Sequence, residues 1–159
     1  MIDLDTSAWA RIGETTNTEY FVIEPGIVAV VPRKGAIDVF ETAQENVNFV
    51  NEHGRREGRP VVMVVFFDRL AAQDSSARKV YSAGPDPTAV CGGAMLGGGL
   101  LGRAVASVFL AIVKPKVVFR MFGAYDEALA WARSLHAAQR PTSNPPSAVP
   151  THDQDRRRA

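Results

Sequence analysis

The sequence predicts one α/β domain with a mostly parallel sheet of four to five strands, an N-terminal β-hairpin, and helices that alternate with strands. Three observations support this. β-Branched runs alternate with amphipathic segments, the run PVVMVVFF at 60–67 is continuously apolar, and Pro25-Gly26 separates two apolar runs near the N-terminus. Alternation of strands with helices favours a parallel sheet whose faces are covered by the helices.

The first elements expected are a hairpin and a helix. Residues 19–24 and 27–31 are rich in β-branched and aromatic side chains, and a two-residue turn separates them. The preceding polar residues, 1–17, are expected to be a flexible, irregular lead-in. A helix is predicted over 37–57, because apolar residues recur there at spacings of three and four, which indicates one buried stripe. The stripe consists of Ala36, Phe40, Ala43, Val47 and Val50.

Strands alternate with helices in the predicted second half of the chain. The run at 60–67 predicts a strand buried on both faces. A short helix is expected from Asp74 to Tyr81, since aspartate is a good N-cap, and Arg78, Lys79 and Tyr81 are expected to form its solvated face. Further strands are predicted at 88–96 and 117–122, and further helices at 100–113 and 125–139.

The domain therefore spans 18–139 and is followed by a tail at 140–159. The tail is rich in proline and polar residues, cannot bury a core, and is expected to be disordered. The net charge of +1 gives no strong attraction to nucleic acid. The single cysteine, Cys91, excludes an intrachain disulfide, and the three histidines are scattered, so neither a metal site nor another cofactor is expected. The N-terminus has no positive region followed by an apolar stretch, so a cytoplasmic location is expected.

One apolar segment, 89–113, is long enough to span a bilayer. Its only charge, Arg103, lies near the middle, where insertion would cost about 2.5–3.5 kcal/mol. Six glycines would weaken a helix there by roughly 1 kcal/mol each. A buried strand, a glycine turn and a buried helix explain the segment better than a transmembrane span.

Four stretches resemble a known family: GRPVVMVVFFDRL, SSARKVY, LLGRAVASVFLAIVKP and FRMFGAYDEALAWARSL. Together they resemble the STAS domain, the fold of bacterial anti-sigma-factor antagonists. The similarity is greatest to uncharacterised bacterial STAS-like proteins that are related to lipid-transfer (CRAL-TRIO) domains. The resemblance implies an STAS-like fold and regulation through protein contacts rather than catalysis.

The family also implies a candidate phospho-switch. In anti-sigma antagonists a serine in an Asp-Ser-Ser-Gly turn is phosphorylated at a helix start, and Asp74-Ser75-Ser76-Ala77 falls at a similar position. The candidate switch residues are Ser75 and Ser76. Alanine replaces the glycine here, and helix capping by Asp74 explains the same residues without any modification.

A glycine turn is the second candidate site. Gly97, Gly98, Gly99 and Gly102 match G-x-G-x-x-G between a predicted strand and a predicted helix. Backbone amides at a helix start attract anions, so this turn and Arg103 are a candidate site for an anion or a lipid headgroup. The alternative is a tightly packed turn, and neither a nicotinamide site nor a P-loop is expected.

The leading functional hypothesis is therefore a non-catalytic regulatory or protein-interaction module, with a protein partner and possible homo-oligomers. The alternative is a carrier of a lipid or a small anionic metabolite. No catalytic residues are assigned, since no acid, base, nucleophile or metal set is evident. A carrier needs an apolar cavity of about 300–1,000 Å³, whereas an interaction module needs a filled core and an exposed patch.

The composition of the tail generates a first prediction. Truncation after Arg140 should leave the melting temperature of the domain nearly unchanged, because residues 141–159 hold too few apolar side chains to pack. Differential scanning calorimetry of both chains measures this. A fall of more than about 5 °C would show that the tail packs on the domain.

Overall fold

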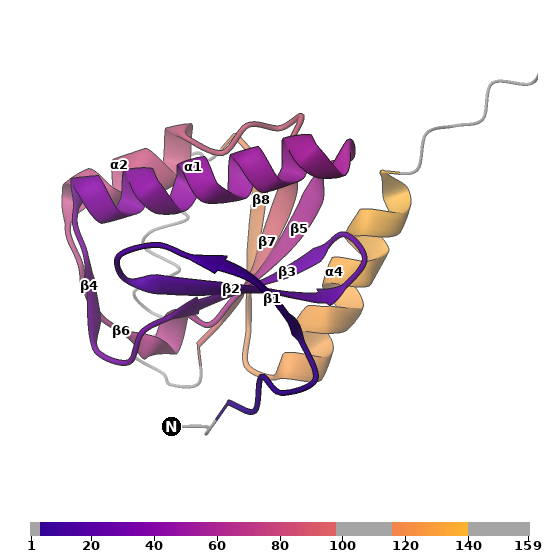
Figure 1. Ribbon diagram of the computed structural model, residues 1–159, viewed down its shortest axis with the longest axis horizontal. Coiled ribbons are helices and arrows are strands. Elements are labelled where there is room, and N and C mark those ends of the chain that lie inside the picture. The colour runs from indigo at the N-terminus through magenta and orange to yellow at the C-terminus, as the bar shows by residue number, and fades with distance from the viewer. Residues whose placement is uncertain (1–3, 98–115, 140–159) are drawn as a thin grey trace, which may run out of the picture.

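The computed structural model describes residues 4–97 and 116–139, in which a six-stranded sheet lies between helices (Figure 1). The first two pairings, β1–β2 and β2–β3, are antiparallel, and β3–β5, β5–β7 and β7–β8 are parallel. The predicted α/β class with a mostly parallel sheet is thus confirmed. In order across the sheet, the strands are β1 (Ala10–Glu14), β2 (Thr18–Glu24), β3 (Ile27–Pro32), β5 (Val61–Val65), β7 (Val90–Leu96) and β8 (Val118–Phe122).

The predicted hairpin joins β2 to β3 through Pro25-Gly26. Gly26 has a φ of 83°, a conformation that favours glycine. A Cβ atom at Gly26 would lie 2.1 Å from His136 Nε2, so the glycine also lets α4 (Tyr125–Ala138) approach the hairpin.

Helices cover both faces of the sheet. The helices α1 (Phe40–Glu57) and α2 (Ser75–Ala83) lie on one face and α4 lies on the other (Figure 1). Buried residues alternate accordingly along β5: Val61 and Met63 join the core beneath α1, and Val62 and Val64 join the core beneath α4. This alternation explains why the β5 run is apolar at every position, since both of its faces are buried.

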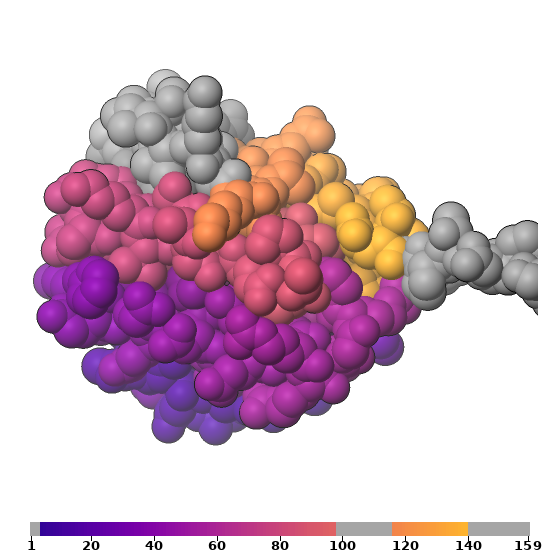
Figure 2. Space-filling model, turned by 90° about the horizontal axis from the view of Figure 1, so that it is seen from above, coloured from indigo at the N-terminus to yellow at the C-terminus, as the bar shows by residue number. Residues whose placement is uncertain are grey.

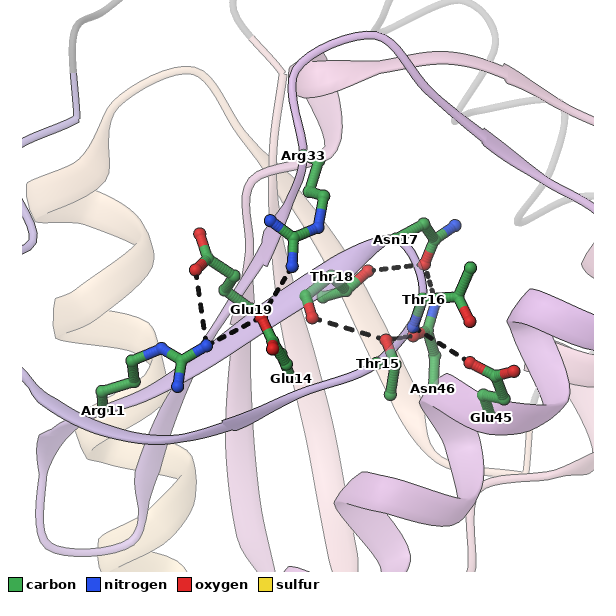
Figure 3. Close-up of polar contacts among 10 residues, drawn as sticks. All are labelled: Arg11, Glu14, Thr15, Thr16, Asn17, Thr18, Glu19, Arg33, Glu45 and Asn46. Carbon is green, nitrogen blue, oxygen red and sulfur yellow. Dashed lines mark hydrogen bonds and ion pairs between the residues drawn. The ribbon is translucent and has the colours of Figure 1, made fainter.

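The polar residues before the hairpin were expected to be irregular, but part of this lead-in is a strand. Residues 10–14 form β1, which adds a sixth strand beyond the four to five predicted. The strand is polar because it lies at an edge of the sheet, where Glu14 pairs with Arg11 at 2.8 Å and with Arg33 at 2.6 Å (Figure 3). The Trp9 ring, just before β1, packs 5.8 Å from the Phe66 ring.

A small two-stranded parallel sheet was also not predicted. It consists of β4 (Ala36–Asp38) and β6 (Leu70–Gln73), and it stands at one end of the molecule (Figure 1). The helix predicted from residue 37 begins at Phe40 instead. The Thr42 hydroxyl accepts a hydrogen bond from the Val39 amide at 3.0 Å, so Val39 stays extended as the N-cap. The 3-10 turn η1 (Phe67–Arg69) links β5 to β6.

The ends of the other elements agree with prediction to within a few residues, and Asp74 is the N-cap of α2 as expected. The predicted helix at 100–113 and the predicted disordered tail lie outside the described residues.

The core between α1 and α2 is small and is formed by Ala43, Val47, Ala77 and Val80.

Close packing of α1 on the segment before β7 depends on Gly54. A Cβ atom there would lie 2.0 Å from the Ala89 carbonyl oxygen. Gly54→Ala should therefore destabilise the domain by about 2–3 kcal/mol through overpacking, although alanine gains about 1 kcal/mol in helix propensity. Chemical denaturation measures the difference.

The matched control is Gly35→Ala. Gly35 has a φ of 76°, but a Cβ atom added there would meet no other atom within 4 Å, so only backbone strain of about 1–2 kcal/mol is expected. A Gly54→Ala variant as stable as the wild type would contradict the close-packing explanation.

Candidate functional site

The first candidate residues, Ser75 and Ser76, lie in the first turn of α2 and differ in their surroundings. The Asp74 carboxylate caps the helix by accepting a hydrogen bond from the Ala77 amide at 2.7 Å. The Ser76 hydroxyl donates to the same Asp74 oxygen at 2.6 Å, whereas the Ser75 side chain is exposed. The Ala77 amide, and after it the Ser76 hydroxyl, hold the pKa of the Asp74 carboxyl below its usual value. Ser76 is thus part of the helix cap and Ser75 is not.

Both helices of this layer begin at the same end of the molecule, because β4 leads into α1 and β6 leads into α2 (Figure 1). The Asp74 amide donates to the Asp38 carbonyl at 3.0 Å, which joins the two helix starts. Figure 2, seen from above, also shows the violet start of α1 beside the pink α2. The serines therefore lie next to the start of α1.

Two large apolar side chains are exposed at this end. Ile37 on β4 is 58% exposed and Phe40 at the start of α1 is 51% exposed. Ile37 is the register partner of Ala72 on β6, which is also exposed. Phe40 was expected on the buried stripe of the helix, and this was wrong because α1 packs through Ala43, Val47 and Val50. We call Ile37, Phe40 and Ala72 the ribbon face.

Beneath this end lies a buried hydrogen-bond network centred on Asn46 of α1. The Asn46 amide nitrogen donates to Asn17 Oδ1 at 3.1 Å and to the Tyr81 hydroxyl at 2.9 Å. Its oxygen accepts from the Thr15 hydroxyl at 2.6 Å and from the Tyr20 hydroxyl at 2.9 Å (Figure 3 shows the Thr15 and Asn17 bonds). Asn46 therefore uses both of its donors and both acceptor positions of its oxygen.

A second centre of the network is the carboxyl group of Asp38, which is 2% exposed. It accepts hydrogen bonds from Asn17 at 2.7 Å, Tyr81 at 2.9 Å, Thr42 at 3.2 Å and Gln73 at 3.4 Å. Four donors occupy the acceptor capacity of a carboxylate, which explains how a charged group is tolerated in the interior. These bonds join β4 to the turn before β2, to α1, to β6 and to α2.

The two tyrosines of the network remain protonated at neutral pH. Burial raises the pKa of the Tyr20 hydroxyl, and burial followed by the negative charge of Asp38 raises the pKa of the Tyr81 hydroxyl. Both hydroxyls can therefore serve as donors, Tyr20 to Asn46 and Tyr81 to Asp38. The expected solvated face of α2 is thus corrected at Tyr81, which points into this network.

A cavity of about 70 Å³ lies between the sheet and the helices α1 and α2. Asp38, Asn46 and Tyr81 form part of its polar lining, and Met63, Leu70 and Phe119 are among its apolar residues. A volume of this size holds a few water molecules, since one water needs about 10–15 Å³. It is several times smaller than pockets for drug-sized ligands, which measure about 300–1,000 Å³.

The glycine turn, the second candidate site, is described only at its first residue. Gly97 donates its amide to the Phe122 carbonyl at 3.2 Å, and so extends the pairing of β7 with β8. Gly98, Gly99, Gly102 and Arg103 lie outside the described residues. Within the described part of the chain, no hydrogen bond or ion pair joins Gly97 to Ser75 or Ser76.

Comparison with protein families gives a match that covers most of the chain. Residues 21–136 match the model of DUF7793, a domain of unknown function. The chain belongs to the DUF7793 family. The matched region of this DUF7793 domain runs from β2 into α4 and includes the ribbon face, Asn46, Asp38 and both serines. A search of the curated proteins finds no match.

Among solved structures, the DUF7793 domain is similar to an uncharacterized protein from the DUF3478 family with a SpoIIAA-like fold, from Shewanella loihica PV-4. The two chains are 14% identical, and the alignment covers 79% of this chain and 92% of that chain, with a TM-score of 0.44.

Within residues 4–97 and 116–139, no helix is long and apolar enough to cross a membrane. The same residues contain no group of three or more His, Cys, Asp and Glu side chains that could hold a metal ion.

The roles of Asp38, Asn46 and Tyr81 in this network were not predicted from the sequence. One signal was present for Asn46: it follows Ala43 by three residues and precedes Val50 by four, so it lies on the buried stripe of α1. A polar residue on a buried stripe needs hydrogen-bond partners. The partners come from distant parts of the chain, so the pattern of α1 alone could not identify them.

The network generates a prediction for Asn46→Asp in this DUF7793 domain. The substitution removes both donated hydrogen bonds and adds a negative charge near the Asp38 carboxyl group. It should destabilise the fold by about 3 kcal/mol or more, measured by chemical denaturation at neutral pH.

The matched control is Asn48→Asp, which makes the same change two residues along α1 at an exposed position. It should stay within about 0.5 kcal/mol of the wild type. Equal effects of the two substitutions would contradict a central role for the network.

Proposed function

We propose that this chain is a non-catalytic protein-interaction module whose contact surface is the end where α1 and α2 begin. The observation that supports this most directly is the exposure of Ile37 and Phe40 beside the capped start of α2. Neighbouring exposed apolar side chains with a polar border are typical of protein contact sites. The proposed location is the cytoplasm, where a lone thiol such as Cys91 stays reduced.

The interior polar groups support a structural role rather than catalysis. The acceptor positions of Asp38 are occupied by four donors from the protein itself. Burial raises the pKa of the Cys91 thiol, which disfavours the reactive thiolate. A catalytic acid, base or nucleophile needs a group that is available to a substrate, and these groups are engaged or protonated.

The alternative is a carrier of a lipid or small anionic metabolite. The cavity of about 70 Å³ between the sheet and the helices is too small for a lipid chain, which needs several hundred Å³. Among the described residues, a more open hollow of about 520 Å³ beside Arg120, Phe122 and Glu127 is the place where a carrier would have to hold its ligand. Native mass spectrometry of the chain purified from its host tests the carrier directly. A ligand of constant mass retained at stoichiometric amounts would favour the carrier over the interaction module.

Regulation by phosphorylation is the finer part of the proposal, and the two serines would respond differently. A phosphate at Ser75 would lie exposed at the N-terminus of α2, where the helix dipole favours negative charge. A phosphate at Ser76 would replace the hydroxyl that donates to Asp74 and would repel the Asp74 carboxylate. We therefore propose Ser75 as the position where added charge leaves the fold intact.

This generates a prediction that needs no partner. Ser76→Asp should lower the melting temperature by about 3 °C or more, because it sets a second carboxylate against the cap of α2. Ser75→Asp should leave the melting temperature unchanged or raise it slightly. The alanine variants of both serines separate loss of the hydroxyl from gain of charge. A Ser75→Asp variant less stable than Ser76→Asp would contradict the assignment.

The interaction itself is tested by affinity capture from a host lysate followed by quantitative mass spectrometry. A specific partner should be captured by the wild-type chain and reduced about tenfold by Phe40→Ser. Val118→Ser is the control, because Val118 is 49% exposed on β8, away from the ribbon face, and should not alter capture. Partners that bind all three chains equally would count against this contact surface.

A further inference from the structure

We propose that two copies of this chain pair through the ribbon face, with a twofold axis near the middle of β4. The inference rests on the proposed function, because it uses the same end of the molecule and names a partner for it. Ile37 of one copy would pack against Ile37 of the other near this axis, and Phe40 and Ala72 of each copy would border the contact.

The local structure explains why the apolar side chains of the ribbon face are exposed. On β4, Asp38 is buried in the polar network, whereas Ile37 is 58% exposed. Ala72 is the register partner of Ile37 on the neighbouring strand, and Phe40 follows two residues after Asp38 at the start of α1. The network holds Asp38 inward, so it also keeps Ile37 directed outward, since alternate side chains of a strand point to opposite faces.

Charge along β4 is arranged to favour a second copy. Lys34 lies three residues before Ile37 and Glu41 lies four residues after it, and both are exposed. In the described part of the chain neither makes an ion pair, while Arg33 is paired with Glu14. If the twofold axis crosses β4 at Ile37 so that the two strands run antiparallel, positions three to four residues before Ile37 in one copy meet positions three to four residues after it in the other. Lys34 would therefore face Glu41 of the second copy at both ends of the contact.

The outer edge of β8 is the competing surface for self-association, since Val118 is exposed there and β8 ends the sheet order. Its central residue is Arg120, which is also exposed. In an antiparallel pair centred on β8, Arg120 would face its own copy, and like charges directly opposite are unfavourable. The charges thus favour the ribbon face over the β8 edge.

Sedimentation velocity of the full chain tests the proposal. A contact of three apolar side chains and two ion pairs predicts a dimer with a dissociation constant on the order of 100 μM. At low salt, the wild type should shift from monomer to dimer between about 10 μM and about 1 mM. Phe40→Ser and Ile37→Ser should each raise the dissociation constant about tenfold or more, and Val118→Ser should not change it. Thermal melting checks that each variant folds.

Charge reversal tests the twofold geometry. Lys34→Glu and Glu41→Lys should each weaken the dimer, and the double variant should restore it, because the pairing of opposite charges is regained. Additive weakening in the double variant would overturn the twofold arrangement. A wild-type chain that stays monomeric at about 1 mM, or a dimer that is lost with Val118→Ser instead, overturns the proposal.

The outcomes also separate this inference from the proposed function. A monomeric wild type whose capture of another protein depends on Phe40 would overturn self-pairing and leave the interaction module intact. A dimer that depends on Phe40, without any partner whose capture depends on it, would support self-pairing and overturn a separate protein partner.

Discussion

The buried amide of Asn46 is the interaction on which one end of the structure depends. A side-chain amide in the interior costs free energy unless all its polar atoms are paired, and Asn46 has partners for every one. Those partners lie on β2, in the turn before it, and on α2. The network therefore restricts how these segments can be placed relative to α1, and small displacements would leave buried groups unpaired.

Asp38 extends the same constraint to the small sheet. Its carboxyl group takes donors from four parts of the chain, so β4 must present this residue inward. The alternation of side chains along a strand then leaves Ile37 exposed. Val39 remains extended and delays the start of α1 to Phe40, which places an aromatic side chain outside the core. An interior requirement for hydrogen bonds thus produces an exposed apolar surface.

The start of α2 belongs to the same system. Gln73 donates to Asp38, the Asp74 amide donates to the Asp38 carbonyl, and the Asp74 carboxylate caps α2 with the help of Ser76. The proposed contact surface and the polar interior therefore share one short segment of chain. A charge added at Ser76, whose hydroxyl donates to Asp74, would act on this segment, whereas a charge added at Ser75 would act only on the surface.

Local sequence patterns were sufficient to predict the α/β class, the hairpin at Pro25-Gly26, the doubly buried strand β5 and the cap at Asp74. These follow from local patterns: turn residues, continuous apolar runs and capping chemistry each act over a few positions. The remaining features depend on contacts between distant segments of the chain. β1 and the β4–β6 pair are strands because of partners far along the chain, since an edge strand can be polar and a three-residue strand has almost no pattern. Phe40 was predicted to be buried and is exposed, and Tyr81 was predicted to be exposed and lies in the buried network, for the same reason. Hydrogen bonds between distant segments determine which of these side chains are buried, and such bonds leave no periodic pattern in the sequence.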